Sequence, residues 1–142
     1  MNEETMQARQ IIEKWHQALN QKDKAQLAAL VQADVKIGGP KGETEGIPVL
    51  LEWVDRANIS LFPQKYFRAG NTFLVEEAAA WHHPETGDLV GSQVVVSVFT
   101  LANNLIARIN RYDNLSQALT ASGLQPQDLK ILPGNEAHNF KK

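Results

Sequence analysis

The chain has 142 residues, of which 43% are hydrophobic and 21% are charged, and its formal net charge is −2 at pH 7. These values are typical of one globular domain and exclude the basic surface by which proteins bind nucleic acid or an anionic membrane. The chain has no cysteine, which excludes disulfides, thiolate metal sites and cysteine nucleophiles. The N-terminus is polar and acidic, unlike a signal peptide, so we expect a cytoplasmic protein with no membrane partner.

The N-terminal segment has the apolar spacing of amphipathic helices. This spacing predicts a helix over residues 4–20 and a second, short helix after Asp23, whose side chain suits the N-cap. Residues 34–37 are predicted to form a short strand. The glycine-rich segment 38–42 is interpreted as a hairpin turn, with an anion site as the less favoured alternative, because glycine permits positive φ and the segment lacks the glycine spacing of a phosphate-binding loop.

A third helix is predicted to begin at Gly46-Ile47-Pro48, with the proline in its first turn. Pro63 is expected to end this helical region. The following segments alternate between polar and apolar residues and predict extended chain at 65–70 and strands at 72–82, 90–101 and 105–113.

The chain after the last strand is predicted to form a helix at 115–122, which Gly123 ends. Helices followed by hairpin-linked strands indicate an α+β fold with an antiparallel sheet. We expect one domain over residues 1–124 and an extended or poorly ordered tail over residues 125–142, which is polar.

Strand alternation divides the side chains of the sheet between two faces. One row in each of the two longest strands is mixed or apolar and is expected to face inward: Phe73, Val75, Glu77, Ala79 and Trp81, and then Gln93, Val95, Ser97, Phe99 and Leu101. Ile109, Arg111 and Asp113 share a face of the last strand. The opposite row Val94, Val96 and Val98 is small and apolar, which suits a contact between the sheets of two subunits.

Three segments together resemble a known family: Leu30-Val31-Gln32-Ala33-Asp34-Val35, the glycine loop before Gly46-Ile47, and Leu105-Ile106-Ala107-Arg108-Ile109-Asn110-Arg111-Tyr112-Asp113. Their order over about residues 5–122 resembles the nuclear transport factor 2-like superfamily, which includes SnoaL-like polyketide cyclases and ketosteroid isomerases. The resemblance implies a cone-shaped, curved antiparallel β-sheet that wraps around the N-terminal helices and encloses a pocket. It also implies a homodimer packed through the sheet, and it places the same rows inward.

The inward rows and the apolar faces of the helices define a candidate pocket. Its members are Trp15, Trp53, Glu77, Trp81, Ser97, Phe99, Arg111 and Asp113. Asp113 and Glu77 are the candidate catalytic residues and the other six are candidate ligand-binding residues. Arg111 is expected to pair with Glu77 or Asp113, and such a pair either contacts a ligand or is purely structural. His16 is interpreted as a solvated helix residue, and we expect neither a metal site nor a cofactor.

The enzyme chemistry that the resemblance implies is only partly supported by the residues. Where ketosteroid isomerases have a tyrosine on the first helix, an aspartate at the end of the first strand and an aspartic acid on a central strand, this chain has Trp15, Ile37-Gly38 and Ser97. We therefore expect a protein that binds a small molecule. Two alternatives remain open: a SnoaL-like cyclase, isomerase or hydrolase that uses Asp113 or Glu77 as general acid and base, and an interaction module whose own side chains fill the cavity.

Overall fold

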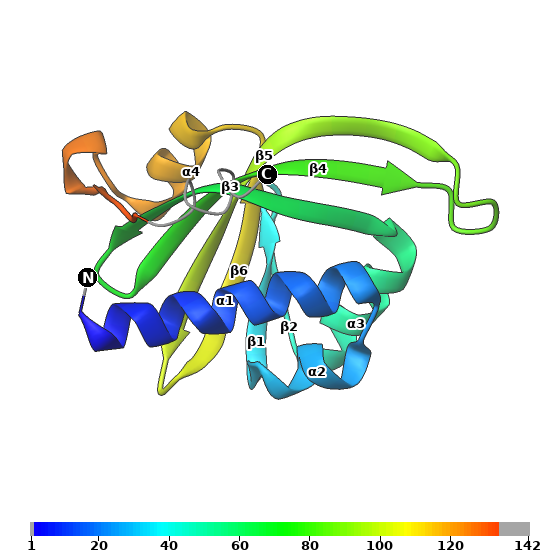
Figure 1. Cartoon of the computed structure of the whole chain (residues 1–142), viewed down its shortest axis with the longest axis horizontal. Coiled ribbons are helices and arrows are strands. Elements are labelled where there is room, and N and C mark those ends of the chain that lie inside the picture. The colour runs from blue at the N-terminus through cyan, green and yellow to red at the C-terminus, as the bar shows by residue number, and fades with distance from the viewer. Residues whose placement is uncertain (1, 134–142) are drawn as a thin grey trace.

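The computed structural model describes residues 2–133, which form one curved sheet with helices on both of its faces (Figure 1). The helices are α1 (Glu3–Gln21), α2 (Lys24–Ala29), α3 (Ile47–Ala57) and α4 (Leu115–Ser122), with a 3₁₀ turn at Pro126–Asp128. The strands are β1 (Val31–Gly39), β2 (Gly42–Glu45), β3 (Ile59–Ala69), β4 (Thr72–His82), β5 (Leu89–Ala102), β6 (Leu105–Tyr112) and β7 (Lys130–Ile131). The predicted α+β class and curved sheet are confirmed.

The seven strands lie in the order β2-β1-β6-β5-β4-β3-β7. Neighbouring strands are antiparallel except β1 and β6, which are parallel. The sequence predicted a wholly antiparallel sheet because the hairpins β3–β4, β4–β5 and β5–β6 dominate the pattern. The long connection from β1 to β6, which includes α3 and four strands, allows the chain to return in the same direction.

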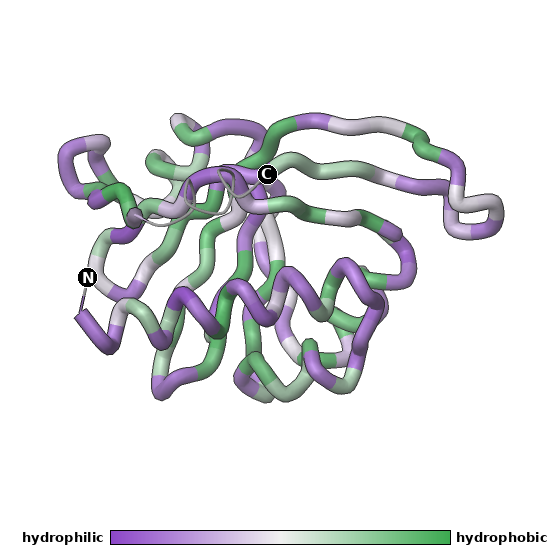
Figure 2. The backbone as a smooth tube through the Cα atoms, in the orientation of Figure 1, coloured by the Kyte–Doolittle hydropathy of each residue, from purple (hydrophilic) through white to green (hydrophobic). Residues whose placement is uncertain are grey.

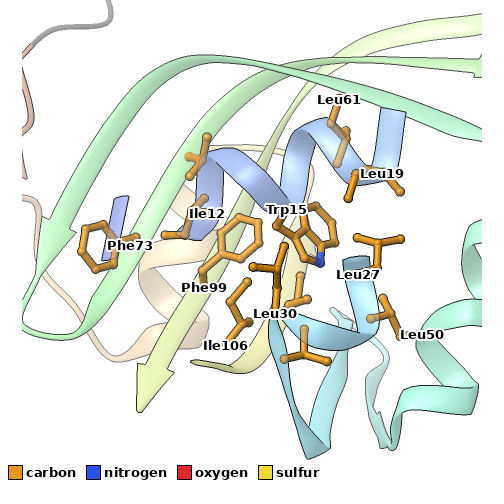
Figure 3. Close-up of a cluster of buried hydrophobic side chains, with 14 of the residues drawn as sticks. Ile12, Trp15, Leu19, Leu27, Leu30, Leu50, Leu61, Phe73, Phe99 and Ile106 are labelled. Carbon is orange, nitrogen blue, oxygen red and sulfur yellow. The ribbon is translucent and has the colours of Figure 1, made fainter. Parts of the chain in front are cut away.

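The main hydrophobic core lies between α1 and the inner face of the sheet. In α1, Ile12, Trp15 and Leu19 are at most 1% exposed, and they pack with Phe73 and Phe99 from the sheet (Figure 3). Figure 2 shows hydrophobic and hydrophilic residues interspersed along α1, as expected for a helix with one buried face. The predicted inward rows of β4 and β5 are confirmed from Phe73 to Ala79 and from Val95 to Leu101.

The outer face of the sheet carries a second core, beneath α4. Val96 and Val98 are 1% and 4% exposed and pack against Ala118 and Leu119 of α4. The prediction that these valines form a contact between subunits is therefore wrong for both, because the chain's own C-terminal helix covers them. Only Val94, which lies beyond α4, stays 50% exposed. A homodimer through the sheet remains a prediction.

Residues 125–133 of the predicted extended or poorly ordered tail pack onto the domain. The 3₁₀ turn is followed by β7, which pairs with β3, and the Leu132 side chain joins the main core. Arg9 of α1 donates a hydrogen bond to the Pro133 carbonyl oxygen. The buried Leu132 side chain and the backbone pairing of β7 with β3 hold this stretch against the domain. The remainder of the predicted tail, residues 134–142, lies outside the described residues.

Pro63 does not end the helical region. Helix α3 already ends at Ala57, where Asn58 adopts the left-handed conformation with φ of 45°. Pro63 lies inside β3, where the register with β4 shifts between Pro63 and Lys65. A proline has no N–H to donate to the sheet, so an irregular position in the strand suits it. Within residues 2–133, no helix combines the length and apolar character that a membrane span requires.

The β1–β2 hairpin turns tightly at Pro40 and Lys41, as predicted for segment 38–42, and this turn requires close backbone contact. A Cβ atom added at Gly38 would lie 2.8 Å from Glu43 Cα and would also collide with the Gly42 carbonyl oxygen. We expect Gly38→Ala to lower the free energy of unfolding by about 1–3 kcal/mol, the usual cost of overpacking. Urea denaturation would measure it.

Gly91→Ala is the matched control, since Gly91 also lies in a strand but has open space around the added Cβ. Its free energy of unfolding should stay level or rise slightly. Equal effects of the two substitutions would contradict the close approach at Gly38.

Candidate functional site

A cavity of about 350 Å³ opens on the inner side of the sheet, next to α3 and the β1–β2 hairpin. Its lining residues are Trp15, Ile37, Gly38, Gly39, Pro40, Lys41, Thr44, Val49, Trp53, Arg56, Leu61, Ser97, Ile109 and Arg111. Four of the predicted ligand-binding residues are among them: Trp15, Trp53, Ser97 and Arg111. The volume is in the lower part of the range of roughly 300–1,000 Å³ that is usual for small-molecule sites.

The sheet register brings the polar groups of this cavity together. Ser97 of β5 lies directly opposite Arg111 of β6, so their side chains leave the same face of the sheet. Two residues further along β5, Phe99 lies opposite Ile109 of β6, and these side chains leave the same face of the sheet. Helix α3 contributes Val49, Trp53 and Arg56, whose spacing of four and three residues places them on one side of the helix.

Arg111 has an unusual environment for a charged side chain. Its guanidinium carbon lies over the rings of Trp53 and Trp81, 5.9 and 5.6 Å from their centroids. Its Nη1 atom is buried and has no hydrogen-bond partner among residues 2–133. Burial lowers the pKa of Arg111, while the charges of Glu77 and Asp113 act to raise it.

The predicted ion pair of Arg111 is wrong. Among the described residues, no carboxylate oxygen lies within 4.0 Å of the guanidinium nitrogens of Arg111. Glu77 makes its hydrogen bonds elsewhere. Asp113 follows the end of β6, is exposed, and lies with its Oδ1 atom 3.3 Å from Gln93 Nε2. Strand alternation alone does not reveal that Asp113 lies beyond the edge of the cavity.

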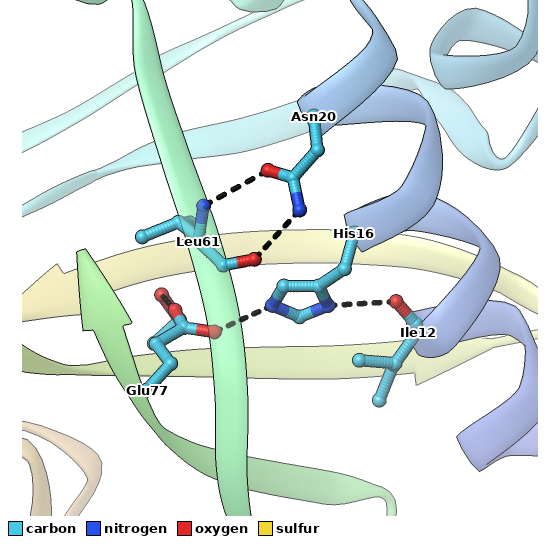
Figure 4. A network of polar contacts seen from close by, with 6 residues as sticks. Ile12, His16, Asn20, Leu61 and Glu77 are labelled. Atoms are coloured by element: carbon cyan, nitrogen blue, oxygen red, sulfur yellow. Dashed lines mark hydrogen bonds and ion pairs between the residues drawn. The ribbon is translucent and has the colours of Figure 1, made fainter. Parts of the chain in front are cut away.

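Glu77 belongs to a buried polar network between the sheet and α1. The side chain is fully buried, and its Oε1 atom lies 2.5 Å from His16 Nε2 (Figure 4). Ser97 Oγ donates a hydrogen bond to Glu77 Oε2. Nearby, the Asn20 amide makes two hydrogen bonds with the backbone of Leu61, which holds α1 against β3. The interpretation of His16 as a solvated residue is therefore wrong, since His16 is 3% exposed.

The hydrogen bonds of His16 determine how many protons this network holds. Nδ1 lies 2.8 Å from the Ile12 carbonyl oxygen, which can only accept, so Nδ1 carries a proton. The contact between Nε2 and Glu77 Oε1 then needs one further proton, on either the imidazole or the carboxyl group. In both cases the His16–Glu77 pair has no net charge.

The remaining predicted site residues have different positions. Phe99 is fully buried in the core, with its ring centroid 5.2 Å from that of Trp15, and does not line the cavity (Figure 3). Trp81 contacts Arg111 but lines a neighbouring hollow of about 510 Å³, which shares Arg56 with the cavity. Trp15 forms a wall of the cavity, although it is only 1% exposed.

Three ionisable residues at or next to the cavity were not anticipated: His16, Lys41 and Arg56. His16 lies four residues after Ile12 and three before Leu19, a spacing that places it on the buried side of α1 and could have revealed it. The lone carboxylate of Glu77 in an apolar row also required a partner. Lys41 and Arg56 carried no such signal, because the sequence did not show that the hairpin turn and the end of α3 border the same cavity.

Comparisons with known proteins agree with this architecture. No protein-family model and no curated protein matches the sequence. Solved structures do match: an NTF2-like protein of unknown function from Cytophaga hutchinsonii has a TM-score of 0.65 and 15% identity, over 79% of this chain and 94% of its own. Another, from Burkholderia pseudomallei, has a TM-score of 0.66 and 13% identity, over 80% and 95% of the two chains.

A third similar structure is a hypothetical protein with a ketosteroid isomerase-like fold from Catenulispora acidiphila, in complex with trimethylamine. It has a TM-score of 0.62 and 20% identity, over 81% of this chain and 93% of its own. Identities this low establish a shared fold and leave activity open. The curved seven-stranded sheet, the helices on its inner face and these neighbours together show that the chain has the nuclear transport factor 2-like fold.

Proposed function

We propose that the chain binds a small molecule in the cavity beside α3. The observation that carries this proposal is a cavity of about 350 Å³ with aromatic and aliphatic walls and two convergent polar groups, Ser97 and Arg111. Ligand sites combine apolar walls with a few placed polar groups in this way. The open volume also weighs against the alternative in which the chain's own side chains fill the interior.

The test is a fragment screen that compares the wild-type protein with a variant whose cavity is blocked. The probes are small aromatic acids, amides, alcohols and amines, and binding is read by saturation-transfer NMR and by the shift in Tm. Val49→Trp places a large side chain at the cavity wall, and Val94→Trp makes the same change on the exposed outer face.

We expect fragments that bind the wild-type protein and Val94→Trp saturably and lose binding in Val49→Trp. A screen without any binding fragment would contradict the proposal. Binding that survives Val49→Trp would also contradict it, because the ligand would then occupy another part of the molecule.

A second candidate function is acid–base catalysis through Glu77. It is favoured by the hydrogen bond from Ser97 to Glu77, since Ser97 lines the cavity and Glu77 does not. When Glu77 is ionised, a ligand could transfer a proton to Ser97 Oγ while the hydroxyl proton moves to Glu77. This role predicts that a bound carbon acid exchanges its acidic C–H proton in D₂O with wild-type protein and much more slowly with Ser97→Ala, as NMR would show. Asp113 is less suited, because it is exposed outside the cavity.

A further inference from the structure

The charged side chains that line the cavity all have one sign. They are Lys41, Arg56 and Arg111, and no aspartate or glutamate is among the lining residues. Arg56 is an exposed residue at the rim, and its Nη1 atom lies 3.0 Å from Glu52 Oε1. Lys41 is exposed as well, so the partly buried Arg111 carries the least exposed positive charge of the cavity, and within the described part of the chain it has no ion-pair partner.

The carboxylates around Arg111 do not balance this charge. Of the two carboxylates, Glu77 has the larger electrostatic effect on Arg111. Glu77 shares a proton with His16, however, so the His16–Glu77 pair has no net charge. Its second oxygen accepts the hydrogen bond from Ser97. Asp113 is exposed, where water screens its charge.

The contacts of Arg111 also leave hydrogen-bonding capacity unused. The indole N–H groups of Trp53 and Trp81 are donors, so these rings offer no conventional acceptor to the guanidinium. The buried Nη1 atom has no acceptor within the described residues. A buried cationic donor without an acceptor is costly, and an anionic ligand would remove that cost.

From these observations we infer that the cavity takes a small organic anion, a carboxylate on a flat apolar body, whose carboxylate binds the guanidinium of Arg111. A planar carboxylate can accept two parallel hydrogen bonds from an arginine. The apolar body would lie against Trp15, Val49 and Ile109, which form the aromatic and aliphatic wall. This inference rests on the proposed function, because it needs a ligand in the same cavity.

The test uses probes of equal shape that differ in charge: 2-naphthoate, 2-naphthamide and 2-naphthylmethylamine, together with the corresponding benzene compounds. Isothermal titration calorimetry at pH 7 measures their Kd values. We expect each carboxylate to bind the wild-type protein at least about tenfold more tightly than its amide, the scale of one hydrogen bond to a charged group. The amines should bind more weakly than the amides.

Arg111→Met removes the charge and keeps an unbranched side chain between the tryptophans. It should abolish the preference for carboxylate over amide. Arg108→Met is the matched control, because Arg108 lies on the same strand but pairs with Glu43 away from the cavity. Arg111→Lys retains the charge without the paired donors, so we expect it to keep part of the preference. The wild-type comparison stands even where a variant fails to fold.

The outcomes separate this inference from the proposed function. Amides or amines that bind the wild-type protein as tightly as the carboxylates would overturn the inference and leave the proposed function intact. A preference that persists in Arg111→Met would do the same. The absence of any carboxylate ligand, while neutral fragments bind the cavity, would overturn the inference, whereas the absence of all binding would overturn both.

Discussion

Replacing Glu77 by leucine should lower the free energy of unfolding by about 3–5 kcal/mol, the scale for removing one member of a buried ion pair. The substitution leaves His16 Nε2 without its partner in a site where both residues are almost fully buried. It also removes the acceptor of the Ser97 hydroxyl. Urea denaturation at pH 7, followed by tryptophan fluorescence and circular dichroism, would measure the loss.

Two further variants decide whether the lost contact with His16 is the cause. Glu76→Leu removes a carboxylate from the neighbouring position on the opposite, partly exposed face and should change stability by no more than about 1 kcal/mol. The double variant His16→Leu with Glu77→Leu should recover much of the loss, because a buried pair replaced by apolar residues is often tolerated. A single-variant loss below about 1 kcal/mol would contradict a tightly coupled network.

Much of the order of the secondary structure could be predicted from the periodicity of this sequence, although β2 and the first half of β3 were missed. Thr72–His82 and Leu115–Ser122 were predicted with their observed limits, since turn residues bound the strand and Gly123 ends the helix. The error at the C-terminal end arises because contacts between residues distant in sequence determine the structure there. Residues 125–133 lack a local signal, yet β3 offers an unpaired edge to β7 and the core accepts Leu132.

The candidate site could be predicted only as far as strand alternation reaches. Alternation correctly put Ser97 and Arg111 on the inner face, but it does not tell a cavity wall from a packed core, and Phe99 proved to be core. Alternation also does not identify the hydrogen-bond partners of buried polar side chains. Glu77 required one, and the choice between Arg111 and His16 depended on how α1 crosses the sheet, which no local pattern encodes.

Phe99 provides the second large effect, because its assignment to the core rather than to the ligand site has a measurable consequence. Its side chain is fully buried, and its ring lies edge-on to Trp15 with centroids 5.2 Å apart and 5.4 Å from that of His16. We expect Phe99→Ala to lower the free energy of unfolding by about 3–5 kcal/mol, through lost burial and the void left behind. Urea denaturation would measure this change.

The control is Phe62→Ala, the same substitution at a phenylalanine that is 53% exposed on the other face of the sheet, where a change below about 1 kcal/mol is expected. Trp53→Ala tests the opposite case, a residue that lines the cavity and is expected to matter more for binding than for stability. Trp53 is a partly exposed wall of the cavity, so its truncation should weaken fragment binding more than it weakens the fold. If Phe99→Ala instead left stability unchanged and abolished fragment binding, Phe99 would be a ligand contact, and the boundary drawn between core and cavity would be misplaced.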